Sequence, residues 1–257
     1  MMTEANETIA VAARRLADVD TAQLADVVDA NHVLFNQGVV DGFGHVSARH
    51  DKHPDCFILA CSMAPALVTA ADIMAFDLDG DAMGGDARRP YLERFIHGEI
   101  YRLRPDVMSV VHSHSPAVIP FGVVPSVKLR CLCHMSGFLG QGVPVFEIRD
   151  VDGPATNLLI SDRARGAALG RALGHETVVL MRGHGSTTVG RTVREAVFHA
   201  VYAEVNARLQ SEAMRLGPVV FLTPEEAQAA AEANAGQMNR AWDMWRMRAH
   251  AAQPAQG

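Results

Sequence analysis

Hydrophobic residues recur at helical spacing in several long stretches of the chain. In residues 22–37 apolar side chains return every three or four positions, and Gly38 follows the last of them, which indicates an amphipathic helix that ends at a glycine. The same spacing predicts helices over residues 7–19, 91–103, 162–173, 192–215 and 224–248. Helices are therefore expected at both ends of the chain as well as in its middle.

Short apolar runs bounded by turn residues, which are typical of β-strands, lie between these helices. They cover residues 45–49, 56–60, 73–78, 107–111, 177–181 and 186–189. The strands do not alternate regularly with helices, which argues against a Rossmann fold or a TIM barrel. We therefore predict an α/β fold, a three-layer α/β/α sandwich around a mainly antiparallel sheet.

No internal repeat, low-complexity linker or block of like charges divides the chain. We therefore expect residues 1–257 to form one domain. The helical segment 218–257, in which Pro218 and Pro224 interrupt the chain, is a candidate for packing on a neighbouring subunit.

The composition narrows the class of function. Of the 257 residues 49% are hydrophobic, and the formal net charge is -6 without any basic cluster, so nucleic acids and anionic membranes are not expected partners. The first residues lack the basic start and apolar stretch of a signal peptide, and no apolar run approaches the roughly 18 residues that span a bilayer. The four cysteines do not suggest a disulfide framework in a chain of this length. These features predict a cytoplasmic enzyme with a small soluble substrate.

Two short histidine motifs carry the strongest chemical signal. His112 and His114 follow the apolar run 107–111, and because side chains alternate along a strand, both imidazoles project to the same side. His184 lies between two glycines just after the run 177–181. Three neutral imidazoles with an open fourth position are a common way to hold a catalytic divalent ion. A single histidine at such a position is more often a core residue, but the two motifs together predict a metal site.

Glu93 is the candidate proton shuttle. It lies at the start of the predicted helix 91–103, where the helix dipole favours a carboxylate, and only one helix and one turn before the paired histidines. A carboxylate beside a metal-bound substrate can move a proton to or from it. The alternative is a solvated glutamate in the first turn of a helix. His97 and Tyr101 share a face of this helix with Glu93, and their spacing favours core or subunit-contact roles.

Together these residues resemble the class II aldolase/adducin superfamily. The resemblance covers residues 20–215 and rests on Glu93, His97, Tyr101, Arg104-Pro105-Asp106, His112-Ser113-His114 and Gly183-His184-Gly185. It implies an α/β/α sandwich assembled as a homo-oligomer, usually a tetramer, with sites near subunit boundaries. It also implies that the three histidines bind one divalent ion per subunit and that Glu93 is the acid/base residue. Imidazole accepts Mn, Zn, Fe and Co, of which Mn²⁺ and Zn²⁺ are the expected ions.

The chain departs from the sugar-phosphate aldolases of this superfamily at the segments that bind phosphate. The aldolases use a Gly-Asn-x-Ser turn, a Thr-Pro-Ser-Gly-like loop and a Ser-Ser pair before the glutamate. This chain has Gly44-His45-Val46-Ser47, Ala60-Cys61-Ser62-Met63 and Pro90-Tyr91-Leu92 at those places. The lost hydroxyl and small residues remove donors that a phosphate dianion requires, so a phosphorylated sugar is not expected.

The segments 41–47, 112–117 and 133–138 resemble instead the decarboxylase branch, whose members remove CO2 from hydroxylated aromatic or pyridine dicarboxylates. The resemblance implies a metal-dependent carbon–carbon lyase, a decarboxylase that stabilises an enolate or keto intermediate. The alternative is an aldolase that acts on a non-phosphorylated hydroxy-keto acid. A non-enzymatic domain like the adducin head is a third interpretation, against which the intact histidines and Glu93 argue.

The resemblance and the expected reaction together suggest residues that contact the substrate, an aromatic carboxylate. The candidates for substrate binding are His45, Ser47, Ser62 and Arg49. Arg49 is alternatively a surface charge at the end of a strand. His134 falls near the place where the aldolases supply a tyrosine from a neighbouring subunit, so it is a candidate second proton donor.

Overall fold

A mixed seven-stranded sheet forms the centre of the computed structural model, which describes residues 18–252. Its strand order is β3-β2-β1-β4-β7-β6-β5, and every neighbouring pair is antiparallel except β5 and β6. The strands are β1 (His45–Arg49), β2 (Cys56–Ala60), β3 (Ile73–Asp77), β4 (Ser109–Ser113), β5 (Val145–Phe146), β6 (Val178–Met181) and β7 (Gly185–Gly190). The predicted α/β class with a mainly antiparallel sheet is confirmed.

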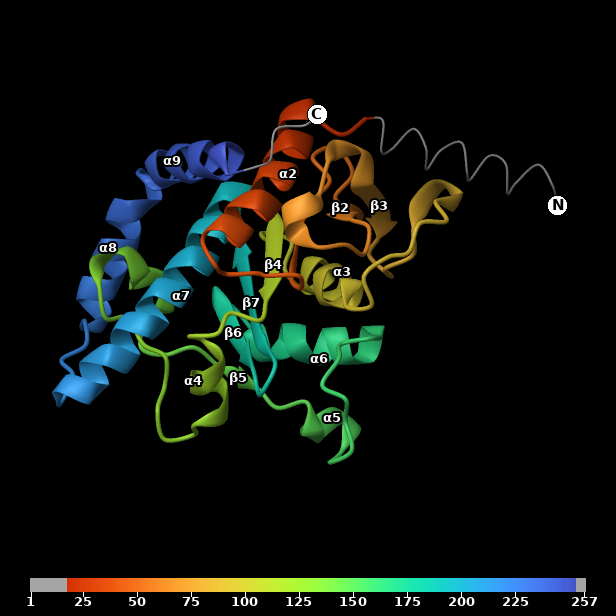
Figure 1. Cartoon of the computed structure of the whole chain (residues 1–257). Helices are drawn as coiled ribbons and strands as arrows, with labels where there is room; N and C mark the ends of the chain where they lie inside the picture. The colour runs from red at the N-terminus through yellow and green to blue at the C-terminus, as the bar shows by residue number, and fades with distance from the viewer. Residues whose placement is uncertain (1–17, 253–257) are drawn as a thin grey trace.

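Helices cover both faces of this sheet (Figure 1). One face carries α3 (Arg94–Leu103) and α6 (Arg163–Leu173), and the other carries α2 (Thr21–Asn36), α7 (Val193–Leu216) and α9 (Met238–Ala251). Shorter helices lie around these layers: α4 (Ile119–Val123), α5 (Arg149–Asp152) and α8 (Pro224–Ala235). The molecule therefore has the three layers of the predicted α/β/α sandwich.

Strand β1 shows how the sheet separates its two faces. Val46 and Ala48 are fully buried in the hydrophobic cluster that includes residues of α2 and α7. His45 and Ser47 point to the opposite face, where both hydrogen-bond to His97 of α3. Because side chains alternate along a strand, one face of β1 builds the core and the other places polar groups under α3.

Side-chain caps set the starts of α2 and α7, two of the helices that pack on the face opposite α3. Asp20 accepts a hydrogen bond from the backbone N–H of Ala22 at the start of α2. Thr192 accepts one from Glu195 at the start of α7. Such caps satisfy backbone donors that the first helical turn leaves unpaired, so they fix where each helix begins.

The C-terminal region contains a helix break that the sequence pattern does not reveal. Instead of one helix over residues 224–248, the chain forms α8 and α9, separated by Gly236 and Gln237. α8 packs on a 3-10 segment, η4 (His134–Leu139), whereas Trp242 and Trp245 of α9 enter the core beside α2 and α7. Two helices that dock on different surfaces cannot remain collinear. The described part of segment 218–257 thus packs on its own chain, and its contact with a neighbouring subunit stays a prediction.

The remaining differences from expectation concern helix ends and short elements. The helix predicted over 91–103 begins at Arg94, so Glu93 immediately precedes it. The helix predicted over 7–19 falls almost entirely outside the described residues. α4, α5 and the two-residue strand β5 lie in a stretch without clear periodicity, where the sequence pattern predicts no element.

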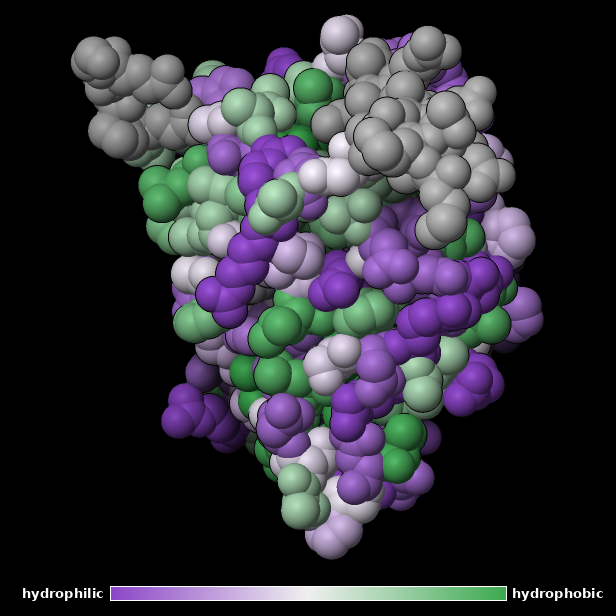
Figure 2. Space-filling model, turned by 90° about the vertical axis from the view of Figure 1, so that its right-hand side faces the viewer, coloured by the Kyte–Doolittle hydropathy of each residue, from purple (hydrophilic) through white to green (hydrophobic). Residues whose placement is uncertain are grey.

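The surface seen in Figure 2 mixes hydrophilic side chains, in purple, with smaller hydrophobic areas, in green. Within the described chain, the most exposed large apolar side chains are those of Leu216 and Val220, each 91% exposed, at the connection between α7 and α8. None of the described helices is long and apolar enough to cross a lipid bilayer.

Candidate metal centre

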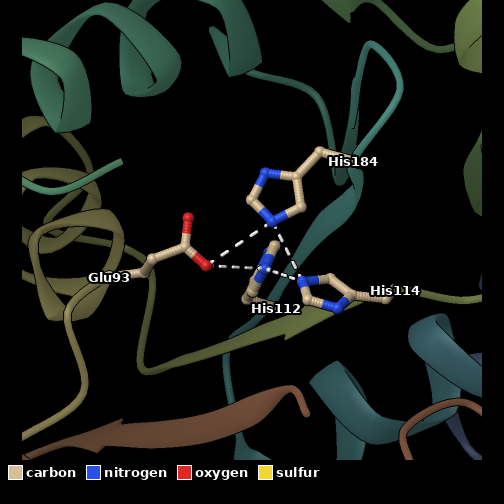
Figure 3. A group of neighbouring side chains, drawn as sticks. All are labelled: Glu93, His112, His114 and His184. Carbon is tan, nitrogen blue, oxygen red and sulfur yellow. Dashed lines mark hydrogen bonds and ion pairs between the residues drawn. The ribbon is translucent and has the colours of Figure 1, made fainter. Parts of the chain in front are cut away.

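Three segments that are far apart in the sequence bring four ligand-type side chains to one point (Figure 3). His112 lies on β4, and His114 follows the end of that strand. His184 comes from the turn between β6 and β7, and Glu93 immediately precedes α3. One possible ligand atom of each residue lies within 4.8 Å of those of the others. The structure therefore brings the three predicted histidines together with Glu93.

Four of the six distances between these atoms are close to those in a tetrahedral metal site. Nε2 of His114 lies 3.2 Å from Nε2 of His112 and 2.9 Å from Nε2 of His184. Oε2 of Glu93 lies 3.4 Å from Nε2 of His112 and 3.5 Å from Nε2 of His184. A tetrahedron with metal–ligand bonds of about 2.0–2.1 Å has edges of about 3.3–3.4 Å. A divalent ion therefore fits among these side chains with little adjustment.

Backbone carbonyls hold two of the imidazoles in the tautomer that metal binding needs. Nδ1 of His112 lies 3.2 Å from the carbonyl oxygen of Ser186, and Nδ1 of His184 lies 3.0 Å from that of Leu158. A carbonyl can only accept, so each Nδ1 carries the hydrogen and each Nε2 presents its lone pair to the centre of the cluster. Leu158 has a φ of 69°, a conformation that leucine rarely adopts, and it is the carbonyl of this residue that orients His184.

The glycines on either side of His184 have separate structural roles. Gly183 has a φ of 68°, in the left-handed region that favours glycine. A Cβ on Gly185 would lie 2.0 Å from the carbonyl oxygen of Ser113, so β7 can approach β4 this closely only with glycine there. Both features place His184 beside His114.

Glu93 is held as a carboxylate by its neighbours. Its Oε1 accepts a hydrogen bond of 3.0 Å from the backbone N–H of Ile160, and its Oε2 faces His112 and His184. Burial favours the neutral acid and would raise the pKa of Glu93. The positive charge that His112 and His184 carry when protonated, together with the Ile160 N–H, outweighs burial and lowers this pKa to about 2, and a bound divalent ion would act in the same direction. Glu93 is thus a proton acceptor before it can become a donor.

Two of the imidazoles, those of His114 and His184, are held in their neutral form. Burial lowers the pKa of His184 to about 4, and it also lowers the pKa of His114. A histidine must be neutral to bind a metal ion. The cluster therefore offers ligands that are ready to bind a metal at neutral pH.

A pocket of about 460 Å³ opens beside the cluster. Glu93 and His114 line it on the side of the metal centre, together with His45. The rest of the wall is largely aromatic and apolar, with Phe43, Met63, Tyr91, Leu92 and Leu159. Such a wall suits a flat hydrophobic ring better than a sugar.

Arg89 supplies a positive charge at this pocket. Its guanidinium forms no ion pair or hydrogen bond with any residue of the range 18–252, and its carbonyl accepts a 2.8 Å hydrogen bond from the N–H of Ser62. The neighbouring Arg88, in contrast, pairs with Asp86. An arginine without a partner can bind a carboxylate of a ligand. The sequence gives no signal that separates Arg89 from Arg88, so it does not predict that Arg89 lies in the site.

The structure brings two of the four predicted substrate-binding residues to the pocket. His45 and Ser62 line it. Ser47 is fully buried instead, with its hydroxyl oxygen 2.6 Å from both Nδ1 of His97 and the hydroxyl of Tyr101. Ser47 therefore supports the site from behind and does not face a substrate.

Arg49 lies at the other end of β1 and does not reach the pocket. Its side chain is buried, so it is not a surface charge either. Its guanidinium donates hydrogen bonds to the backbone carbonyls of Pro54, Tyr101, Arg104 and Val107. Arg49 thus ties chain segments together, and four of its five N–H donors are already used.

His134 lies on η4, apart from the metal centre of its own chain. Its carbonyl accepts a hydrogen bond of 2.8 Å from the side chain of Asn234 on α8. The pocket that it lines contains Leu132, Val220 and Leu222 and none of the four cluster residues. A contact between His134 and a site would therefore have to involve another subunit.

Comparison with known proteins adds independent information. A model of the class II aldolase and adducin N-terminal domain family matches residues 25–211. The chain is 35% identical over 237 residues to decarboxylase tropJ of Talaromyces stipitatus, an alignment that covers 83% of this chain and 89% of that protein. It is 32% identical over 218 residues to a 3,4-dihydroxyphthalate decarboxylase of Terrabacter sp., with 79% and 86% covered. An aldolase II superfamily protein from Pseudomonas syringae has the same fold, with a TM-score of 0.73 at 20% identity over 92% of this chain and 96% of that one.

Proposed function

This chain belongs to the class II aldolase and adducin family, and from that membership we propose that it is a divalent-metal-dependent decarboxylase of a hydroxylated aromatic or pyridine dicarboxylate. The observation that carries the proposal is the cluster of three imidazoles and Glu93 beside a pocket that also holds Arg89. Two relatives that are named decarboxylases support it, one of them a dihydroxyphthalate decarboxylase.

The proposed reaction breaks the bond between a ring carbon and a carboxylate carbon. His112, His114 and His184 would hold a divalent ion, which would supply a Lewis acid for the electrons that move toward a substrate oxygen. Glu93 takes the proton of the ring hydroxyl and delivers it to the ring carbon that carries the departing carboxylate. The carbon–carbon bond then breaks, its electrons restore the aromatic ring, and CO2 leaves.

The wall of the pocket supports a ring with two acidic groups. Phe43, Tyr91 and Leu92 offer apolar surface for a planar ring. With the hydroxyl and one carboxylate directed at the cluster, the second carboxylate would face Arg89. A dicarboxylate would therefore contact both the metal centre and Arg89.

The second candidate is an aldolase that acts on a non-phosphorylated hydroxy-keto acid. The likeness of the fold to an aldolase II superfamily protein favours it, and it would use the same histidines and Glu93. Both reactions leave an electron pair on carbon that a neighbouring oxygen must stabilise. The products separate them, since the aldolase releases an aldehyde and no CO2.

The test is CO2 release from a panel of ortho-hydroxylated benzene and pyridine dicarboxylates. The protein is assayed as purified, after treatment with a chelator, and after addition of Mn²⁺ or Zn²⁺. We expect release that disappears with the chelator and returns with the metal. Protein that holds metal and releases no CO2 from any member would overturn the proposal, and aldehyde formation from hydroxy-keto acids would then establish the second candidate.

The proposal includes one Mn²⁺ or Zn²⁺ ion per subunit and a homo-oligomeric assembly. The oligomer is supported by Leu216 and Val220, whose large apolar side chains are almost fully exposed in one chain. In such an assembly His134 of one subunit would be the second proton donor at the site of another. Sedimentation analysis measures the assembly, and metal analysis measures the stoichiometry.

A further inference from the structure

Four hydrogen-bonded side chains run from the wall of the pocket into the core. Nδ1 of His45 lies 2.7 Å from Nε2 of His97, and Nδ1 of His97 lies 2.6 Å from Oγ of Ser47. The same oxygen lies 2.6 Å from the hydroxyl of Tyr101. Of the four, His45 alone lines the pocket, and the other three are at most 1% exposed. This relay joins a pocket residue to polar groups that no substrate can reach.

The buried end of the relay decides the direction of its hydrogen bonds. Among the described residues, Oγ of Ser47 is the one hydrogen-bond partner of the Tyr101 hydroxyl, and a hydroxyl oxygen can accept as well as donate. The phenolic hydrogen must therefore go to Oγ of Ser47. The reverse direction would leave this hydrogen buried without an acceptor, which disfavours it by roughly tenfold or more.

The direction continues through the two imidazoles. Ser47 accepts from Tyr101 and donates its own hydrogen to Nδ1 of His97. Burial keeps His97 neutral by lowering its pKa to about 3, so its single ring hydrogen is on Nε2 and is donated to Nδ1 of His45. His45 therefore accepts at Nδ1 and carries its hydrogen on Nε2.

The His45 ring lies at the wall of the pocket, next to the metal centre. The ring packs against Tyr91 and His112, with ring centroids 4.6 Å and 5.1 Å away, and His45 is the cross-strand partner of His112. Its Nε2 has no hydrogen-bond partner among residues 18–252. A donor without a partner thus lies next to a metal ligand, on the wall of the pocket.

We propose that Tyr101, Ser47 and His97 are positioning residues that fix His45 as an N–H donor for a carboxylate oxygen of the substrate. The direction of the relay is independent of the reaction, whereas the choice of a carboxylate rests on the proposed function. The opposite tautomer would turn a lone pair toward the carboxylate and repel it. The relay thus makes this part of the pocket selective for an acceptor group.

Nitrogen-15 NMR of histidine-labelled, zinc-loaded protein tests the relay without turnover, because it separates ring nitrogens that carry hydrogen from those that do not. The His45 signals are identified by their absence in His45→Gln. We expect a bare Nδ1 and a protonated Nε2 in the wild type. A protonated Nδ1 with a bare Nε2 would overturn the proposal without any need for a relay variant.

The positioning role is tested with phthalate, a benzene dicarboxylate without the ring hydroxyl that the reaction requires. His97→Leu removes the donor to His45, and we expect both His45 tautomers in its spectrum and an affinity for phthalate about tenfold lower. His97→Gln restores an amide donor and should bring the affinity back to within about threefold. His199→Gln, at a buried histidine that hydrogen-bonds to the Val189 carbonyl, is the matched control and should bind phthalate like the wild type.

Wild-type affinity for phthalate in a folded His97→Leu protein would overturn the positioning role, with the fold checked by circular dichroism. If that variant does not fold, Ser47→Ala takes its place, with Ser109→Ala as the matched buried serine. Failure of the wild type to bind phthalate would overturn the assignment of a carboxylate. A fixed tautomer in a protein that releases no CO2 would overturn the proposed function alone and leave the relay established.

Discussion

Glu93 touches two imidazoles through one oxygen and the Ile160 N–H through the other, so its replacement separates metal binding from proton transfer. Glu93→Gln keeps an acceptor for Ile160 but cannot take a proton. We expect the variant to bind the wild-type amount of metal and to lose about 10²–10⁴-fold in kcat. Metal analysis and CO2 release measure the two effects. Glu99→Gln is the control, because Glu99 is a buried glutamate on α3 that pairs with Arg163. A wild-type kcat in Glu93→Gln would assign the proton transfer to another group.

Arg89 should affect substrate binding more than turnover. It lies at the pocket, away from the bond that breaks in the proposed reaction, so Arg89→Ala should raise KM about 10- to 100-fold with little change in kcat. Arg89→Lys keeps the charge but loses the two-pronged contact, and it should recover part of the loss. Arg89→Ala should also lose any preference for dicarboxylates over monocarboxylates. Equal losses with both kinds of acid would show that Arg89 does not bind the second carboxylate.

His97 links the stability of the fold to pH. Burial lowers its pKa from 6.5 to about 3, so between these values the unfolded chain binds a proton that the folded chain does not. The stability that neutral His97 contributes is complete above pH 6.5, the pKa of this histidine in the unfolded chain. Below that pH the free energy of unfolding falls by about 1.4 kcal/mol per pH unit. We expect urea unfolding of metal-free protein to show this loss between about pH 6.5 and pH 5. His97→Gln should reduce the slope of the free energy of unfolding against pH by the equivalent of about one proton. Replacement of the exposed His175 should leave this slope unchanged.

At the scale of residues, the sequence identifies functional side chains that lie in local motifs. It misses those whose role depends on contacts with residues far away in the sequence. His112, His114 and His184 are recognisable because a strand pattern precedes each motif, and the fold brings them together. The spacing of His97 suggests a buried role, but its partner at position 45 lies on a strand 52 residues earlier. Arg89 is recognisable only when the pocket is seen.

At the scale of elements, the approach of β7 to β4 determines the position of His184. A Cβ at Gly185 would collide with the carbonyl oxygen of Ser113, so Gly185→Ala must push the two strands apart. We expect about 1–3 kcal/mol less stability and a metal affinity at least roughly tenfold lower. Thermal unfolding and competition with a chelating dye measure these effects. Gly236→Ala, where a Cβ has open space, is the control, and wild-type metal affinity in Gly185→Ala would show that this contact does not position His184.

The elements that the sequence predicts well are those whose own residues determine them. The strands and long helices follow from periodicity, and the order of the layers follows from their grouping. The break between α8 and α9 does not, because the stretch keeps its helical pattern while the two halves pack against different partners. The two-residue strand β5 exists only through its pairing with β6.

At the scale of the whole molecule, α9 should be required for the stability of its own subunit. Trp242 and Trp245 are 1% and 4% exposed, and a chain that ends at Gly236 would uncover the core that they fill. We expect this truncation to cost several kcal/mol, at about 1.5–3 kcal/mol for each large apolar side chain, and to lower the melting temperature sharply. Met247→Ala, on the exposed side of the same helix, should have little effect. A truncated chain with an unchanged melting temperature but an altered assembly would show that the segment serves neighbouring subunits instead.

The ligands of the metal centre come from the start of α3, the end of β4 and the β6–β7 turn, so a bound ion would act as a cross-link among three stretches of chain. An unfolded chain cannot keep these groups together and must release the ion. By mass action, each tenfold increase in free metal above the dissociation constant then adds about 1.4 kcal/mol to the free energy of unfolding. The temperature at which the protein melts therefore reports how tightly each ion is bound. A series of melting curves in different metal salts would rank Mn²⁺ against Zn²⁺ before any substrate is known.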